Sequence, residues 1–153
     1  MVVHLASDLT TFRGEGVVHP DAMTDIEVTS TCEEGYTANN VIDDEWELTV
    51  DALGEDGPSA QQVLVADYAS CYLPALRVAA DQTGYDDIGE IEIDVEADLD
   101  EDDDVSAIRF DLRVEEDLGD DEQEVVELGE EICHVHDALR EELHADISIE
   151  SGV

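Results

Sequence analysis

Basic residues are almost missing from this chain. Five arginines and no lysine stand against 44 aspartates and glutamates among 153 residues, which gives a formal net charge of -39. So negative a surface repels phosphate backbones, and this excludes nucleic acid as a partner. In molar salt, where the Debye length falls to about 3 Å, such a surface becomes tolerable and its carboxylates hold water and cations. We therefore interpret the composition as that of a salt-adapted protein.

Cysteine is scarce as well, with Cys32, Cys71 and Cys133 as its three occurrences. An odd number of thiols in a reducing compartment argues against structural disulfides and leaves redox or packing roles. The opening MVVHLASDLT has neither the basic flank nor the apolar run of a secretory signal. The longest apolar run, residues 63–80, is interrupted by Asp67 and Arg77, which is too polar a pattern for a membrane span. We expect a cytoplasmic protein with no membrane partner.

Despite its acidity, the chain has the hydrophobic content of a folded protein. Hydrophobic residues make up 42% of the sequence and occur in periodic runs, which excludes a disordered acidic chain. A length of 153 residues suits a single domain spanning 1–153. The segments DIEVTST, GYTANNVI and EWELTV are short, β-rich and separated by turn residues. They predict that residues 1–56 are mainly β.

A capping box predicts the start of a long helix. Ser59 and Gln62 have the spacing at which each side chain satisfies a backbone N–H of the other. The helix is expected over residues 59–83, and because it is apolar almost all round it should be buried. Pro74 removes one helical donor, so the helix should kink after Cys71 or consist of two shorter helices.

The second half predicts a hairpin and a second helix. IEIDVEADL and AIRFDLRV alternate apolar and polar residues across residues 90–115, with Arg109 and Arg113 facing an acidic strand and available for cross-strand pairing. Residues 120–144 have an apolar stripe at helical spacing, with a cap formed by Asp120 and Gln123. ADISIE near the end predicts a short strand.

Two segments around the thiols resemble one known family. GPSAQQVLVADYASCY and ICHVHDAL are similar to the two cysteine segments of the osmotically induced and organic hydroperoxide resistance proteins, the OsmC/Ohr family. They occur in the same order, 62 positions apart counting from 71 to 133, and the likeness covers roughly residues 46–149. The resemblance implies an α+β fold with antiparallel sheets and two main helices, the long central helix being buried in an intertwined homodimer.

The same resemblance implies a thiol peroxidase that needs no cofactor. Cys71 would be the peroxidatic thiol that becomes a sulfenic acid, and Cys133 the resolving thiol that forms a disulfide with it. A dithiol reductant would then restore the pair. The apolar wall around Cys71 would favour organic hydroperoxides, because only an organic tail gains from leaving water.

The sequence departs from the family around the first thiol. Gln61 stands ten residues before Cys71, where the family has a glutamate. The family's arginine has no clear counterpart; Arg13, the only N-terminal arginine, lies in a segment that does not align. Asp67, one helical turn before Cys71, would disfavour a thiolate. Because ten helical residues rise about 15 Å, Gln61 can reach a Cys71 only from a partner chain.

Several alternatives remain open at this point. Leu64, Tyr68, Tyr72 and His136 are expected to line a pocket around the thiol, although aromatic packing and an interior histidine explain the last three equally. Cys71 is otherwise a small core residue.

Other interpretations of the whole protein also stay open. Cys133 and His136, with His134 or Cys71, form an incomplete metal set, so we expect no metal. The second hypothesis for function is a catalytically inactive dimer that binds a hydrophobic small molecule. The third is a metal-binding or purely structural dimer.

Overall fold

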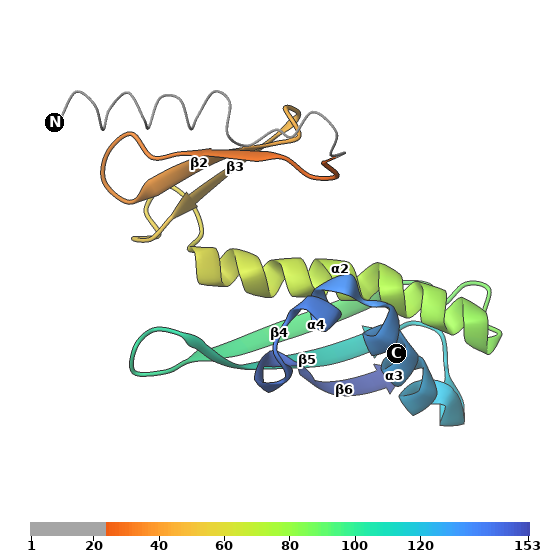
Figure 1. Cartoon of the computed structure of the whole chain (residues 1–153). Helices are drawn as coiled ribbons and strands as arrows, with labels where there is room; N and C mark the ends of the chain where they lie inside the picture. The colour runs from red at the N-terminus through yellow and green to blue at the C-terminus, as the bar shows by residue number, and fades with distance from the viewer. Residues whose placement is uncertain (1–23) are drawn as a thin grey trace, which may run out of the picture.

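The computed structural model describes residues 24–153 and has an α+β fold (Figure 1). One antiparallel sheet contains β1 (Val28–Thr31), β2 (Thr37–Ile42) and β3 (Trp46–Asp51), and a second sheet contains β4 (Ile91–Leu99), β5 (Val105–Val114) and β6 (Asp146–Ser151). The long helix α2 (Ala60–Thr83) lies between the two sheets. The chain from β5 to β6 contains η1 (Gly119–Asp121), α3 (Glu122–Ile132), α4 (His134–Ala138) and η2 (Glu141–Leu143).

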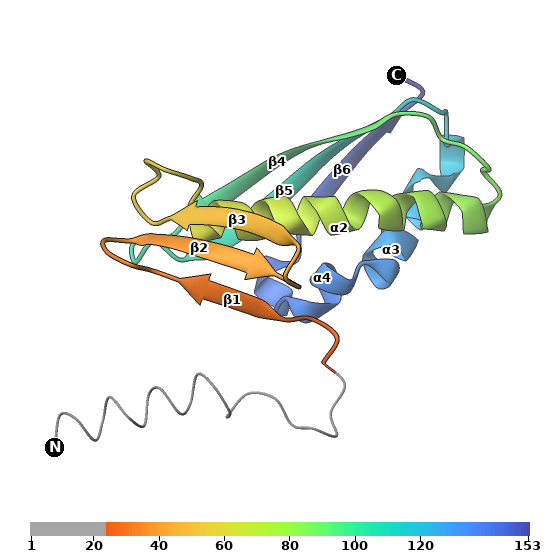
Figure 2. The ribbon, with the colours of Figure 1, turned by 90° about the horizontal axis from the view of Figure 1, so that it is seen from above.

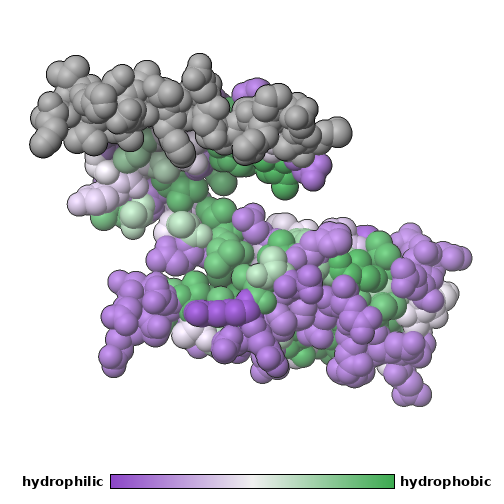
Figure 3. Space-filling model, viewed as in Figure 1, coloured by the Kyte–Doolittle hydropathy of each residue, from purple (hydrophilic) through white to green (hydrophobic). Residues whose placement is uncertain are grey.

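The first sheet has little covering from the rest of residues 24–153. β1 is exposed along its whole length, and most of β2 and β3 is only half-buried. Large apolar side chains therefore remain at the surface, among them Ile26, Tyr36 and Trp46, the last being 63% exposed. Figure 3 shows hydrophobic surface on this sheet and on the neighbouring start of α2. A three-stranded sheet needs a packed face for stability, and these residues leave that face largely open.

The helix α2 begins and ends where the sequence predicts. Ser59 accepts a hydrogen bond from the N–H of Gln62, whose side chain accepts one from the N–H of Ser59, so the capping box is confirmed. Gly84 closes the helix with φ of 108°, a conformation that favours glycine. The alternative of two shorter helices is wrong, because one helix continues through Pro74 (Figures 1 and 2). Proline removes a single ladder bond, and the buried Tyr72 and Leu76 on either side hold the helix in place.

Only one face of α2 is buried within the described chain. That face consists of Tyr68, Tyr72, Ala75, Leu76, Ala79 and Ala80. Beside this face, Leu64 is 36% and Val78 45% exposed. By length and composition α2 would also pass for a membrane span, but core helices of soluble proteins pass the same test. Its buried face packs on α3, α4 and β4, as in a core helix.

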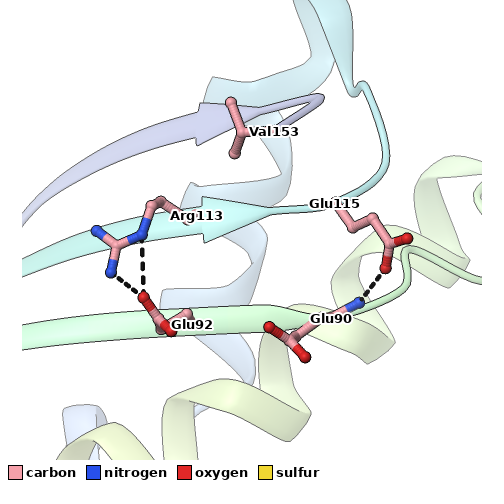
Figure 4. A pocket seen from close by; sticks show the side chains of 5 residues that line it. All are labelled: Glu90, Glu92, Arg113, Glu115 and Val153. Atoms are coloured by element: carbon pink, nitrogen blue, oxygen red, sulfur yellow. Dashed lines mark hydrogen bonds and ion pairs between the residues drawn. The ribbon is translucent and has the colours of Figure 1, made fainter.

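The hairpin of the second sheet confirms the predicted alternation. β4 and β5 pair antiparallel, with Arg109 opposite Glu96 and Arg113 opposite Glu92. Arg109 also contacts Asp98 at 2.8 Å. Figure 4 shows the ion pair between Arg113 and Glu92 on the outer face. The predicted cross-strand pairing is thus present.

The terminal strand adds one parallel pairing to the antiparallel sheets that the resemblance implies. ADISIE does form a strand, β6, but β6 runs parallel to β5. The reason is the connection: the chain crosses over through α3 and α4 before it returns beside β5, and a crossover of this kind joins parallel strands. The second sheet is therefore mixed.

A single second helix over residues 120–144 is also wrong. α3 ends at Ile132, and Cys133 has an extended backbone with φ of -70° and ψ of 110°. Its sulfur accepts the N–H of His136 at 3.4 Å, so Cys133 caps the start of the short α4. The predicted cap at Asp120 is not formed; Asp121 precedes α3, and its carboxylate accepts the Tyr85 hydroxyl instead.

Candidate functional site

The fold brings Cys71 and Cys133 together. Cys71 is on α2 and half-buried, whereas Cys133 lies at the break between α3 and α4 and is 0% exposed. Cys71 packs against the buried core that contains Cys133, and it is close enough to raise the pKa of the Cys133 thiol. Both thiols are free. A partly accessible sulfur therefore stands next to a fully buried one.

The environment of Cys133 keeps its thiol protonated. Burial is the main cause that raises the pKa of Cys133, and the neighbouring Cys71 raises it further. The backbone N–H of His136 acts in the opposite direction, because a donor to sulfur favours the thiolate. Cys133 is thus a neutral thiol that is shielded from solvent.

A hydrogen-bonded network lies one helical turn from the thiols. The hydroxyl of the buried Tyr68 is 2.6 Å from Nδ1 of His136 and accepts the N–H of Ala145 at 3.0 Å. Since a backbone N–H can only donate, the Tyr68 proton is free to point at Nδ1. His136 is then neutral and carries its proton on Nε2. Its ring stacks on that of His144 with centroids 3.8 Å apart.

Tyr72 is a core residue with a satisfied hydroxyl. It is fully buried, donates to the carbonyl of Val126 at 3.0 Å, and contacts Phe110 with ring centroids 5.6 Å apart. Burial raises the pKa of Tyr72 well above its ordinary value. Tyr68 contacts the same Phe110 ring at 4.7 Å. Both tyrosines therefore belong to the buried core.

Gln61 lies at the other end of α2. Its amide donates to the carbonyl of Asp103 at 3.3 Å, and with Val65 it borders an apolar groove of about 570 Å³ between α2 and β4. Ile93, Val95, Leu99 and Val105 complete much of the lining. Gln61 therefore does not reach Cys71 of its own chain. Leu64 is not among the residues that line this groove and instead belongs to the exposed side of α2.

No arginine among residues 24–153 forms an ion pair or hydrogen bond with either thiol. Arg77 donates to the carbonyl of Gly89 at 2.7 Å, and Arg109 and Arg113 are engaged with carboxylates on the outer face. Arg13, named from the sequence, lies outside the described residues. Asp67 is exposed on α2.

The third cysteine and the acidic residues lie elsewhere. Cys32 is exposed after β1, where its thiol donates to the carbonyl of Gly35 at 3.5 Å. Within the described part of the chain, no three histidine, cysteine or acidic side chains are grouped closely enough to hold a metal ion.

Sequence reasoning missed His144 and Ala145 as parts of this site. Neither belongs to a local motif, and both reach the network only because the chain between α4 and β6 folds back over Tyr68. Hydrogen-bond partners 77 positions apart, such as Tyr68 and Ala145, leave no periodic signal in the sequence.

Comparison with known proteins identifies the class to which this fold and thiol pair belong. The family model of OsmC-like proteins matches residues 53–148, a range that includes both thiols. A protein of Haloferax volcanii described as uncharacterized is 50% identical over 128 residues, covering 83% of this chain and 96% of that protein.

Solved structures agree with this match. The organic hydroperoxide resistance protein OhrB of Bacillus subtilis is 25% identical with a TM-score of 0.63, covering 84% of this chain and 100% of that chain. An OsmC like protein from Mycoplasma pneumoniae is 16% identical with a TM-score of 0.69, covering 86% and 98%. The chain belongs to the OsmC-like protein family.

Proposed function

We propose that this protein is a thiol-dependent peroxidase that reduces organic hydroperoxides in a salt-adapted cytoplasm. Cys71 is the peroxidatic thiol and Cys133 the resolving thiol. The observation that carries the proposal is the meeting of a partly accessible Cys71 and a buried Cys133 from two distant segments. Membership of the OsmC-like family supports it.

The chemistry follows from the two thiols and a hydroperoxide. The Cys71 thiolate attacks the outer oxygen of the O–O bond, the bond breaks, and the organic part leaves as an alcohol after taking up a proton. Cys71 is then a sulfenic acid, which condenses with the Cys133 thiol to give a disulfide and water. A dithiol reductant reduces this disulfide by exchange and is itself oxidised to a disulfide.

Burial supports the order of the two roles. Cys133 is 0% exposed, so a hydroperoxide cannot approach it, and its raised pKa makes it a poor first nucleophile. Cys71 is partly open to solvent. Cys71 packs against the hydrophobic core, and such an apolar environment suits an organic rather than an inorganic peroxide.

The uncovered faces support a homodimer as the working form. Leu64 and Val78 on α2 and Trp46 on the first sheet are apolar and exposed. A second copy packed there would bury them and bring Gln61 of one α2 towards Cys71 of the other. The amide oxygen of Gln61 would then orient a guanidinium without acting as a base.

Peroxidase assays test the proposal directly. With an alkyl hydroperoxide, a dithiol reductant and molar salt, we expect catalytic consumption of the hydroperoxide by the wild type. Cys71→Ser should abolish consumption, Cys133→Ser should leave about one turnover per chain, and Cys32→Ser should change nothing because that thiol is distant. No turnover by a protein with all thiols free would refute the peroxidase.

A second candidate function rests on the groove between α2 and β4. Its volume of about 570 Å³ and its lining of Val65, Ile93, Val95 and Leu99 suit an apolar small molecule. Gln61, where the family has a glutamate, is consistent with lost catalysis. An inactive protein that binds an apolar fluorescent probe, with binding weakened by Val95→Glu, would favour this alternative.

A further inference from the structure

We propose that the hydrogen bond between Tyr68 and His136 fixes the register of the α3–α4 break against α2 and so positions Cys133 in front of Cys71. Tyr68 and His136 are thus positioning residues for disulfide formation. The proposal rests on the redox function proposed above and assigns a role to two side chains that do not take part in the chemistry.

Two residue pairs join α2 to the segment that contains Cys133 and α4: Tyr68 with His136, and Cys71 with Cys133. Tyr68 precedes Cys71 by three residues on α2, and His136 follows Cys133 by three residues on α4. Residues three apart on a helix lie on the same face, so the Tyr68–His136 contact and the Cys71–Cys133 contact stand one turn apart. A change in how Tyr68 contacts His136 therefore displaces Cys133 relative to Cys71.

The two pairs are also linked through His136, which bonds both Tyr68 and Cys133. Its ring accepts the Tyr68 hydroxyl at 2.6 Å, while its backbone N–H donates to the Cys133 sulfur at 3.4 Å. His136 thus binds the Cys133 sulfur through its main chain and binds Tyr68 of α2 through its side chain. The orientation of the Cys133 thiol depends on where Tyr68 holds this ring.

Local structure alone does not hold the break in place. α4 has five residues, too few for a helix that is stable by itself, so tertiary contacts must fix it. Tyr68 supplies two of these, since its hydroxyl also accepts the N–H of Ala145 at the entry to β6. The hydroxyl is 0% exposed together with its ring, which excludes water as a substitute partner.

With the Tyr68 hydroxyl as donor, the Tyr68–His136 bond requires a neutral imidazole whose Nδ1 carries no proton. Protonation would turn Nδ1 into a donor, so the bond would reverse and leave the buried Tyr68 hydroxyl proton without an acceptor. Burial lowers the pKa of His136 from its ordinary 6.5, the nearby His144 lowers it further, and Asp137 acts in the opposite direction. The bond with Tyr68 as donor is therefore intact near neutral pH and is disfavoured as the pH falls below the ordinary value. The titratable groups that face His136 are Tyr68 from α2, Glu127, Glu130 and Glu131 from α3, Asp137 from α4, and His144 before β6.

The equilibrium between the protein dithiol and its disulfide, measured against oxidised and reduced dithiothreitol, tests the proposal without peroxide. The measurement uses the full chain with Cys32→Ser in molar salt, and alkylation with mass spectrometry gives the oxidised fraction. Tyr68→Phe should lower the equilibrium constant about three- to tenfold, the worth of one buried hydrogen bond. Tyr72→Phe is the matched control, because it removes another buried hydroxyl from α2 that bonds Val126 and not His136. It should leave the constant unchanged.

The pH profile separates positioning from simple stability. Between pH 7 and pH 5 the constant of the wild type should fall as His136 takes up a proton. His136→Asn keeps an acceptor near the Nδ1 position but does not titrate, whereas His144 and Glu130 are still present. Its constant should match the wild type at pH 7 and should fall less than that of the wild type by pH 5.

Two results would overturn the proposal while leaving the peroxidase intact: equal constants for Tyr68→Phe and the wild type, or a His136→Asn profile that falls like the wild type. If Tyr68→Phe does not fold, His136→Leu removes the same bond from the other side and should give the same loss. A wild type that forms no disulfide between Cys71 and Cys133 under oxidised dithiothreitol would instead remove the redox function itself.

Discussion

Asp51 is the only buried acidic side chain among residues 24–153, at 2% exposed. Its carboxylate accepts the N–H groups of Leu53, Glu55 and Asp56 at 2.9 to 3.1 Å. The N–H of Asp51 donates to the carbonyl of Pro58, which closes the loop between β3 and the capping box of α2. A single carboxylate therefore fixes the junction between the first sheet and the helix that carries Cys71.

The first prediction is that Asp51→Ala lowers the stability of the protein at pH 7, because three N–H groups lose the buried carboxylate that accepts them. The Asp56 N–H is the leading cause that holds the pKa of Asp51 below its ordinary 3.8. A lowered folded pKa stabilises the protein above pH 3.8, and the benefit is lost as the pH falls through the folded value. Melting curves of both proteins should differ at pH 7 and converge as the pH falls below 3.8. Asp56→Ala, which keeps its backbone N–H, is the control and should melt like the wild type.

At the scale of elements, the packing of α3 on α2 decides where Cys133 lies. Gly129 faces α2, and a Cβ added there would lie 3.2 Å from the Tyr72 hydroxyl. Tyr72 cannot move aside easily, because it is fully buried and hydrogen-bonded to Val126. The missing side chain thus permits the close approach of the two helices that brings the break at Cys133 to Cys71.

Gly129→Val should therefore destabilise the protein by about 1 to 3 kcal/mol through overpacking. It should also slow formation of the disulfide between Cys71 and Cys133 by forcing the helices apart. Chemical denaturation measures the first effect and timed alkylation after oxidation the second. Glu131→Val places the same β-branched side chain at an exposed position of α3. It should change the free energy of unfolding by no more than about 0.5 kcal/mol and the rate of disulfide formation by no more than the corresponding factor. A fully stable Gly129→Val would show that Tyr72 has room to shift.

At the scale of the whole molecule, the described chain has an incomplete interior. The first sheet exposes Trp46, and α2 exposes Leu64 and Val78. The outer face of the second sheet is by contrast a network of carboxylates around Arg109 and Arg113. The exposed apolar side chains are those that the proposed homodimer would bury, whereas the acidic face would remain in solvent and be screened by salt.

Leu64→Asp combined with Val78→Asp should convert the protein from dimer to monomer, since two charges would be buried without partners in the interface. Sedimentation in molar salt should give about half the mass of the wild type. Val153→Asp adds a charge at an apolar position that is also exposed, near Arg113, and should remain dimeric. A wild type that sediments as a monomer would contradict the proposed dimer.

Much of the fold can be predicted because its signals are local. Ser59 and Gln62 mark the start of α2 by their spacing alone, and Gly84 ends it in a conformation that few other residues adopt. The alternation of IEIDVEADL and AIRFDLRV determines both the hairpin and the pairing of Arg109 with an acidic strand. The two cysteine segments also identify the family from sequence.

The remaining features depend on contacts between distant segments. The sequence around Cys133 does not indicate that this residue has an extended backbone and interrupts the helix. The parallel pairing of β6 follows from a crossover connection, which hydrophobic periodicity does not predict. The register of Tyr68 on His136, the stack on His144 and the bond to Ala145 likewise exist only once α2, α4 and the entry to β6 are packed. The sequence by itself determined the elements, the acidic surface and the two thiols, because caps, periodicity and charge act over a few residues. Only the tertiary structure decided that a buried Cys133 meets Cys71, because that meeting depends on packing between segments more than sixty residues apart.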